Sequence, residues 1–334
     1  MPEPLNVGRV IGRLPRSFCI LAISLVLIHG KGDHEKKRKT MELVCHYCSI
    51  PAFCEMIKHI YKKGDEYFIT FWASSIYAMN DPYEFVYGYE LLMKSILPDI
   101  EKEIGITDSK LKLSQILNQL PRTTTISDWN KKILNAIYES DNCPFIVSFS
   151  KRIDYLPMWN TYSDRGKGVC LCFKDHEWKW NETIVDIKNH LNASEVTYGE
   201  FNHNIKGIIC DQYKDLYNQY KNIPEGEQRV KNMIMYLATL TVIAAPYHKH
   251  KAYEYEEEAR LIENIDKNYS VKYRLNNNNR IIPYIEVPVK LEYLNKIIVG
   301  PCADSESVIR ELKNMLSKYN ITNILASSIP YREY

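Results

Sequence analysis

The sequence lacks the short motifs that mark the commonest nucleotide-binding and hydrolytic folds. Neither G-x-G-x-x-G nor a P-loop motif occurs in its 334 residues, which include only 13 glycines. Both motifs bring backbone amides close to phosphate groups, so their absence excludes a Rossmann dehydrogenase and a P-loop nucleotide hydrolase. G-x-S-x-G is absent as well, and no base is evident for Ser148 or Ser150, so nothing in the sequence predicts a serine hydrolase.

The sequence also lacks an excess of either charge. It has 43 Lys and Arg residues against 41 Asp and Glu residues, and its formal net charge is +2. This balance gives no overall field that would attract nucleic acid or an anionic membrane, although a local basic groove is compatible with it.

Apolar runs long enough to cross a bilayer are missing too. Residues 18–28 and 233–245 are the two apolar stretches that stand out, whereas a spanning helix needs about 20 such residues. The second stretch predicts a buried core helix. We therefore expect a cytoplasmic protein without a membrane partner.

Cysteine spacing gives no disulfide framework, because the nine cysteines are an odd number without regular intervals. We expect free, buried thiols in a reducing compartment. Cys170 and Cys172 alternate within a predicted strand and should share one face. Cys45-x-x-Cys48 suggests zinc, but no second ligand pair follows at a suitable spacing, so no metal site is predicted.

Residues 1–40 differ from the rest of the chain. Three arginines precede the apolar stretch, as in a signal peptide, but no small-residue cleavage site follows. The run Glu35–Lys39 requires purine-rich codons directly before Met41, as a ribosome-binding site would. We expect residues 1–40 to be a mis-annotated or signal-like leader and residues 41–334 to form the folded domain.

Strand and helix patterns alternate irregularly along residues 41–334, without an internal repeat or a linker. This arrangement predicts one α+β domain with a central, mostly antiparallel sheet and helical insertions. The first predicted helix begins after Ser49. Further helices are predicted at about 83–104, at 110–140 in two pieces, at 204–245 and at 309–316. The predicted strands are 43–48, 67–72, 145–150, 168–173, 195–198, 269–275, 281–289, 296–299 and 321–327.

The stretch from Pro144 to Phe173 has two apolar strands separated by a polar and aromatic loop. The loop contains Trp159, Tyr162 and Lys167. Charged and aromatic side chains between two buried strands are typical of a binding site, since loops on a rigid scaffold usually carry function. The alternative is a structural lid in which the aromatic rings pack on the core.

The acidic run from Glu256 to Glu258 is the strongest chemical signal. In a strand, Glu256 and Glu258 would point to one face and Glu257 to the other. Two neighbouring carboxylates make an acid/base pair, because their repulsion raises one pKa. The alternative is a solvated edge strand, or ion pairs with Lys249, Lys251 and Arg260.

Several spaced blocks resemble the bacterial family called domain of unknown function 2971. Besides SFS, MWxxY and KGVCLCF in the central stretch, they are HYCS at 46–49, NDPYE at 80–84, EEEAR at 256–260, IIVGP at 297–301 and IPYR at 329–332. The family's name leaves its activity open.

A more distant likeness is to ADP-ribosyltransferases, which have an early histidine, an aromatic strand followed by serines, and a late E-x-E strand. The resemblance implies NAD as substrate and a role in toxin or phage-defence biology. It implies that Glu258 is catalytic with Glu256 as its partner, and that NAD contacts His46, Tyr47, Trp72 and Ser74. Tyr47 departs from the small residue usual after this histidine, and the late strand lies beyond large helical insertions.

The loop residues Trp159, Tyr162 and Lys167 would add further nucleotide contacts. The alternative function is a non-catalytic module that binds a nucleotide or a nucleic-acid end through these residues and Arg165. The sequence leaves the acceptor and the oligomeric state open.

Overall fold

The computed structural model describes residues 43–79, 84–115, 144–174, 192–264, 270–275 and 279–331. The predicted leader at 1–40, the start at Met41 and most of the predicted helices within 110–140 lie outside these ranges.

A large, mostly antiparallel sheet forms the centre of the protein, in the order β10-β11-β3-β4-β1-β5-β12-β13. β2 pairs with β3, β9 with β4, and β6 with β9, and the β12–β13 pair alone in this sheet is parallel among the described strands. The predicted α+β class is therefore confirmed. The strands are β1 (Leu43–Cys48), β2 (Tyr61–Lys63), β3 (Glu66–Ser75), β4 (Pro144–Ser150), β5 (Val169–Lys174), β6 (Asn192–Glu195), β9 (Glu258–Asn264), β10 (Lys272–Leu275), β11 (Ile281–Lys290), β12 (Leu294–Val299) and β13 (Ile324–Ala326).

The sheet divides along one edge of β4. β3 pairs with the beginning of this strand, where Ser74 is opposite Ile146, and β1 pairs with its end, where Cys45 is opposite Ser150. The other edge of β4 is paired along its whole length with β9. β3 and β1 therefore pair with different ends of the same edge, and the polar end of β4 lies beside β1, where His46 contacts the carbonyl oxygen of Ser148.

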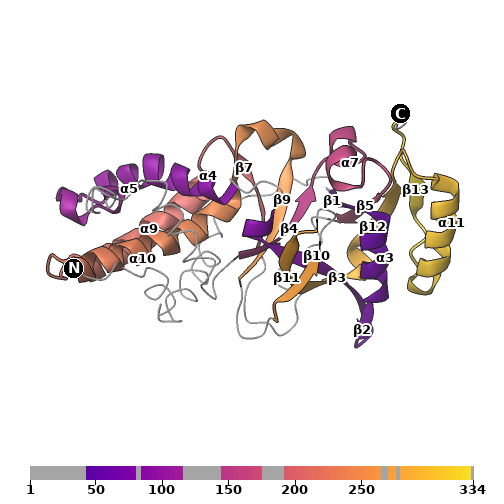
Figure 1. Cartoon of the computed structure of the whole chain (residues 1–334), viewed down its shortest axis with the longest axis horizontal. Helices are drawn as coiled ribbons and strands as arrows, with labels where there is room; N and C mark the ends of the chain where they lie inside the picture. The colour runs from indigo at the N-terminus through magenta and orange to yellow at the C-terminus, as the bar shows by residue number, and fades with distance from the viewer. Residues whose placement is uncertain are drawn as a thin grey trace, which may run out of the picture.

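Helices flank the sheet at both ends of the molecule. Figure 1 shows α5, α9 and α10 together on one side, and α3 and α11 near the opposite end. The helices are α3 (Ile50–Lys58), α4 (Glu84–Leu91), α5 (Leu97–Glu103), α7 (Leu156–Tyr162), α9 (His203–Tyr220), α10 (Glu227–Ala244) and α11 (Ser305–Leu316), and a π-helical turn at Leu92–Ile96 joins α4 to α5.

Local sequence signals explain several of these boundaries. Ser49 caps α3 by accepting a hydrogen bond from the amide of Ala52, and Pro51 lies in the first turn, as predicted. The predicted helical region 204–245 is two helices, because residues 221–226 contain Pro224 and end at Gly226 with a φ of 153°. The predicted hairpin of β10 and β11 is confirmed.

Two stretches differ from the sequence prediction. Residues expected to form a loop after Ser150 contain the short helix α7, which starts beside Pro157 in its first turn. The acidic run is not one strand: Lys251–Glu256 is a 3-10 segment, and β9 begins only at Glu258. A two-stranded parallel pair, β7 (Thr197–Tyr198) and β8 (His248–Lys249), lies before this segment.

One hydrophobic core joins the sheet to the helices, and a smaller cluster lies apart from it. The large core includes Phe71 and Leu171 of the sheet together with Leu97, Tyr213 and Leu237 of the helices. The small cluster lies around α7. No helix among the described residues is both long and apolar enough to cross a membrane.

Candidate active site

A cleft of about 310 Å³ opens where β1 and β4 separate. Its wall is built from β1, β4, α7, β8, the 3-10 segment and the first residue of β9. Lining residues are Cys45, His46, Tyr47, Met79, Glu84, Ser148, Phe149, Ser150, Met158, Thr161, Tyr162, Lys249, Tyr253, Tyr255, Glu256 and Glu258.

Five buried charged residues form what we call the charged floor: Glu84, Lys249, Glu256, Glu258 and Arg260. None is more than 4% exposed. The ammonium of Lys249 donates to Glu256 at 2.6 Å and to Glu258 at 3.0 Å. Arg260 holds both oxygens of Glu258 at 2.9 Å and also pairs with Glu84. Three carboxyl groups thus share two cations in a site from which water is largely removed.

Burial sets the electrostatics of this floor. It raises the pKa of Glu258, against the opposing effects of Lys249 and the Ser148 hydroxyl. Burial disfavours the charged form of Lys249, but the nearby carboxylates of Glu258 and Glu256 outweigh it and raise the pKa of Lys249. With one carboxyl group in excess over the cations, the floor is suited to hold or release a proton.

The two glutamates reach the same cleft through a turn. Glu256 ends the 3-10 segment, Glu257 adopts a left-handed conformation with a φ of 41°, and Glu258 begins β9. The side chain of Glu257 pairs with Arg152 at 2.6 Å, outside the floor. Glu256 and Glu258 therefore face together, as strand alternation predicted, but the cause is the reversal at Glu257.

His46 presents a neutral imidazole at the split in the sheet. Its Nδ1 lies 3.0 Å from the carbonyl oxygen of Ser148, so this nitrogen is the donor in a neutral ring. The ring packs edge-on to Phe71 and against Phe149, with centroids 5.1 and 5.7 Å away. Burial lowers the pKa of His46, and the charge of Arg274 adds to that effect.

Tyr162 connects α7 to the charged floor, because its hydroxyl donates to Glu256 at 2.8 Å. α7 is in turn fixed by Asp154, which accepts hydrogen bonds from the indole of Trp159 at 2.9 Å and from Ser327 and Ser328 near the C-terminal end. Trp159 itself is fully buried against Tyr47, with ring centroids 5.0 Å apart. Of the two predicted loop aromatics, Tyr162 faces the cleft and Trp159 is a core residue.

The other predicted contacts lie elsewhere. Trp72 packs on Tyr284 with centroids 5.4 Å apart, and Arg274 lies over the same indole while donating to Ser74 at 3.1 Å. Lys167 is exposed beyond α7 and does not line the cleft. Tyr47 does line it, although its hydroxyl donates to the carbonyl of Arg152 at 2.6 Å.

The cleft contains functional groups that the sequence did not single out as a site. Lys249 and Arg260 were predicted as ion-pair partners of the acidic run, and they are, but inside the protein rather than on an edge strand. Glu84 comes from the NDPYE block, more than 150 positions from Lys249 and Arg260 in the sequence, so no spacing rule connects them. The tyrosines at 253 and 255 lie on the 3-10 segment, where no helix was expected.

Three thiols gather beneath α7. Cys45 and Cys172 are directly opposite in the β1–β5 pair with their sulfur atoms 3.4 Å apart, and Cys170 lies 3.8 Å from Cys172. The predicted shared face of Cys170 and Cys172 is confirmed. Hydrogen bonds from the Cys170 and Cys45 thiols lower the pKa of Cys172 to about 5, whereas burial raises the pKa of Cys170. Cys48 is in the main core, away from Cys45.

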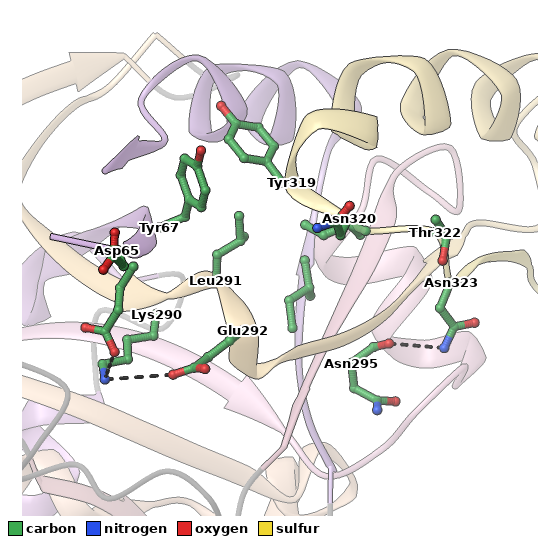
Figure 2. A pocket seen from close by; sticks show the side chains of 13 residues that line it. Asp65, Tyr67, Lys290, Leu291, Glu292, Asn295, Tyr319, Asn320, Thr322 and Asn323 are labelled. Atoms are coloured by element: carbon green, nitrogen blue, oxygen red, sulfur yellow. Dashed lines mark hydrogen bonds and ion pairs between the residues drawn. The ribbon is translucent and has the colours of Figure 1, made fainter. Parts of the chain in front are cut away.

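A second hollow, of about 330 Å³, lies between the start of β3 and the residues that follow α11. Figure 2 shows Tyr67 and Tyr319 at one side of it and Asn295 near Asn323 at the other. Lys290 forms ion pairs with two glutamates there, at positions 66 and 292. The charged groups are partly exposed and satisfied by one another, so we assign the site to the cleft with the charged floor instead.

Comparison with known proteins identifies a family. Residues 158–261 match the model of a protein of unknown function, DUF2971. The match confirms the predicted family over this segment, which is less than half of the chain. The matched segment includes most of α7, all of β5 and the acidic run, and it covers the charged floor except Glu84. No curated protein and no solved structure matched the chain significantly.

Proposed function

We propose that the protein is an NAD-consuming transferase whose reaction takes place over the charged floor. The observation that carries the proposal is the convergence of His46, Glu256 and Glu258 on one cleft. His46 lies about 210 positions before the two glutamates in the sequence. The distant likeness to ADP-ribosyltransferases assigns the histidine and the glutamates complementary roles around one substrate.

Cleavage of the nicotinamide–ribose bond leaves positive charge on the ribose, and a fixed carboxylate stabilises that charge. Glu258 is suited to this role because Arg260 holds both of its oxygens, so its position does not have to be reorganised during the reaction. Glu256 is bound by Tyr162 and Lys249 and would orient the attacking group. His46 would hold the ribose through the nitrogen that does not face Ser148.

The size of the cleft limits what it accepts. At about 310 Å³ it is at the lower end of small-molecule sites, so we place only the nicotinamide and its ribose inside it. Tyr162, Tyr253 and Tyr255 provide the aromatic wall, which replaces Trp72 as the surface against which nicotinamide packs. A role in toxin or phage-defence biology, with an acceptor of unknown class, is part of the same proposal.

The test is nicotinamide release from NAD by the purified chain, with cell lysate as a source of acceptors. We expect Glu258→Gln to lower the rate by about 10²-fold or more, since it removes the charge that stabilises the transition state. Glu257→Gln is the matched control, because its side chain points to Arg152 and should leave the rate unchanged.

Circular dichroism of both variants checks that they are folded. Equal nicotinamide release from wild type and Glu258→Gln would contradict the proposal, as would the absence of both NAD binding and release. Binding of NAD without release would favour the alternative, a non-catalytic nucleotide-binding module.

A further inference from the structure

The thiol group of Cys45, Cys170 and Cys172 has no role in the chemistry proposed for the cleft, although Cys45 also borders that cleft. The three side chains are at most 1% exposed, and their sulfur atoms all lie within 4.8 Å of one another. Among the residues that the structure describes, no other set of three His, Cys, Asp or Glu side chains comes this close. Nothing in the proposed transferase reaction uses these thiols.

The geometry of the thiols is that of a metal site. Three sulfur ligands around one ion at about 2.3 Å lie about 3.8–4.0 Å from one another. Two of the three separations, 3.4 and 3.8 Å, differ from this by only a few tenths of an ångström, and the third, between Cys45 and Cys170, is within 4.8 Å. The backbone holds these positions rigidly, because Cys45 and Cys172 are paired neighbours in the middle of the sheet.

The surroundings select the kind of ion. The apolar side chains around the thiols include Tyr47, Met158, Trp159 and Ile298. Among the described residues, no histidine or carboxylate joins the three sulfur atoms within the same 4.8 Å, although the charges of Lys296 and Asp154 act on Cys172. A structural zinc site almost always has four ligands, and an iron–sulfur cluster has four thiolates. Three thiolates, with the thioether of Met158 in the same cluster, are typical of a soft ion that accepts low coordination.

We propose that Cys45, Cys170 and Cys172 bind one monovalent copper ion beneath α7. The thiols release their protons to solvent as the copper–sulfur bonds form, and no electron is transferred. Since Met158 and Trp159 of α7 cover the group, the ion enters as the chain folds rather than afterwards. The site would fasten β1 to β5 below the wall of the cleft.

The test is to unfold the full chain with a chelator and a reductant, and to refold it without oxygen in the presence of Cu⁺ supplied as its acetonitrile complex. We expect one copper per chain after desalting, ultraviolet copper–thiolate absorption, and a higher midpoint of thermal unfolding than the metal-free protein. A parallel refolding with Zn²⁺ should give no retained metal.

Cys45→Ser and Cys172→Ala should abolish copper retention, whereas Cys54→Ser and Cys302→Ser should not, because these two partly exposed thiols lie outside the group. Copper retained by both Cys45→Ser and Cys172→Ala would overturn the proposal. The proposal also fails if wild type refolded with Cu⁺ has the same midpoint of thermal unfolding as wild type refolded without metal. Preferential retention of zinc, or a Cys45–Cys172 disulfide found by mass spectrometry in place of metal, overturns it too.

Discussion

Lys249 contributes one of the two positive charges of the charged floor. It lies almost wholly inside the protein and bonds two carboxylates, so its removal would leave three carboxyl groups with Arg260 alone. Breaking a buried ion pair from one side costs several kcal/mol, although the intact pair itself need not be stabilising. The floor is therefore weak evidence for stability, since apolar residues of similar volume often hold a fold as well as a buried ion pair does.

His248, the neighbour of Lys249, makes the stability of the protein dependent on pH. It is fully buried, stacks on Phe201, and accepts a hydrogen bond from the amide of Asn202 at Nε2. Burial lowers the pKa of His248 to about 4, below the ordinary value of 6.5. Only the unfolded chain binds the proton between these values, so stability is complete above about pH 6.5 and falls as the pH drops to 4.

We predict that this histidine accounts for roughly 3 kcal/mol of lost unfolding free energy over that interval. Urea titrations at pH 7 and pH 4.5 should show a smaller pH difference for His248→Gln than for wild type. His203→Gln, at an exposed position, is the control and should behave as wild type. An unchanged pH difference in His248→Gln would refute the assignment.

The sequence predicted single residues well where a local pattern was sufficient. Glu256, Glu258 and His46 were identified because they lie in distinctive short motifs, and all three line the cleft. Trp159 was also identified, but an aromatic in a loop gives no sign of whether it faces solvent or core. The thiol group was missed, because its members come from two paired strands and only Cys45-x-x-Cys48 has a familiar spacing.

Among the elements, the start of β5 and the end of β12 lie so close to neighbouring backbone that no side chain fits at Gly168 or Gly300. A Cβ atom at Gly168 would lie 2.1 Å from the carbonyl oxygen of Cys48, and one at Gly300 would lie 2.3 Å from that of Gly166. The glycines in KGVCLCF and IIVGP are thus required for the approach of three chain segments, not for a turn. Gly168 also donates a backbone hydrogen bond to Ser163, the residue after α7, at 2.9 Å, which holds the end of this helix beside the start of β5.

We predict that Gly168→Ala costs about 3 kcal/mol or more of unfolding free energy, because the backbone on both sides has to shift. Gly207→Ala is the matched control, since its Cβ would meet nothing within 4 Å on helix α9. That variant should stabilise the protein by about 0.5–1 kcal/mol, as alanine does in a helix interior. Equal free energies for the two variants, measured by denaturant unfolding, would contradict this interpretation.

At the scale of elements, the sequence was sufficient for most strands and for α3, because alternation, caps and turn residues are local signals. It was insufficient at the acidic run, where the left-handed residue Glu257 replaces an expected strand position. The sequence could not predict the division of the sheet at β4 either. β1 and β3 share one edge of β4, and no local pattern shows which strands from distant parts of the chain will pair.

Over the whole molecule, one core connects the helices around α9 and α10 with the sheet that carries the site. Leu237 of α10 belongs to the same buried cluster as Leu171 of β5, although Figure 1 shows the two elements at separate ends. A shared core makes unfolding cooperative, because neither part keeps its apolar surface covered without the other.

We predict that thiol labelling in denaturant gives the same midpoint for Cys170 in the sheet and Cys210 in α9, both of which are buried. Leu237→Ala should remove about 2–5 kcal/mol and lower the two midpoints together. Mass spectrometry of labelled peptides measures both positions in one sample. Earlier labelling of Cys210, before Cys170 reacts, would show that the helices unfold as a separate unit.

The hydrogen bonds from Ser327 and Ser328 to Asp154 have a consequence for the order of events during synthesis. Asp154 fixes Trp159, and the same short helix presents Tyr162 to Glu256. A ribosome makes every residue of the charged floor before it reaches Ser327, so a nascent chain has the carboxylates but not the fastened wall. The wall of the cleft would therefore be complete only after this late segment has docked, and under the proposed function any cleavage of NAD would wait for that step.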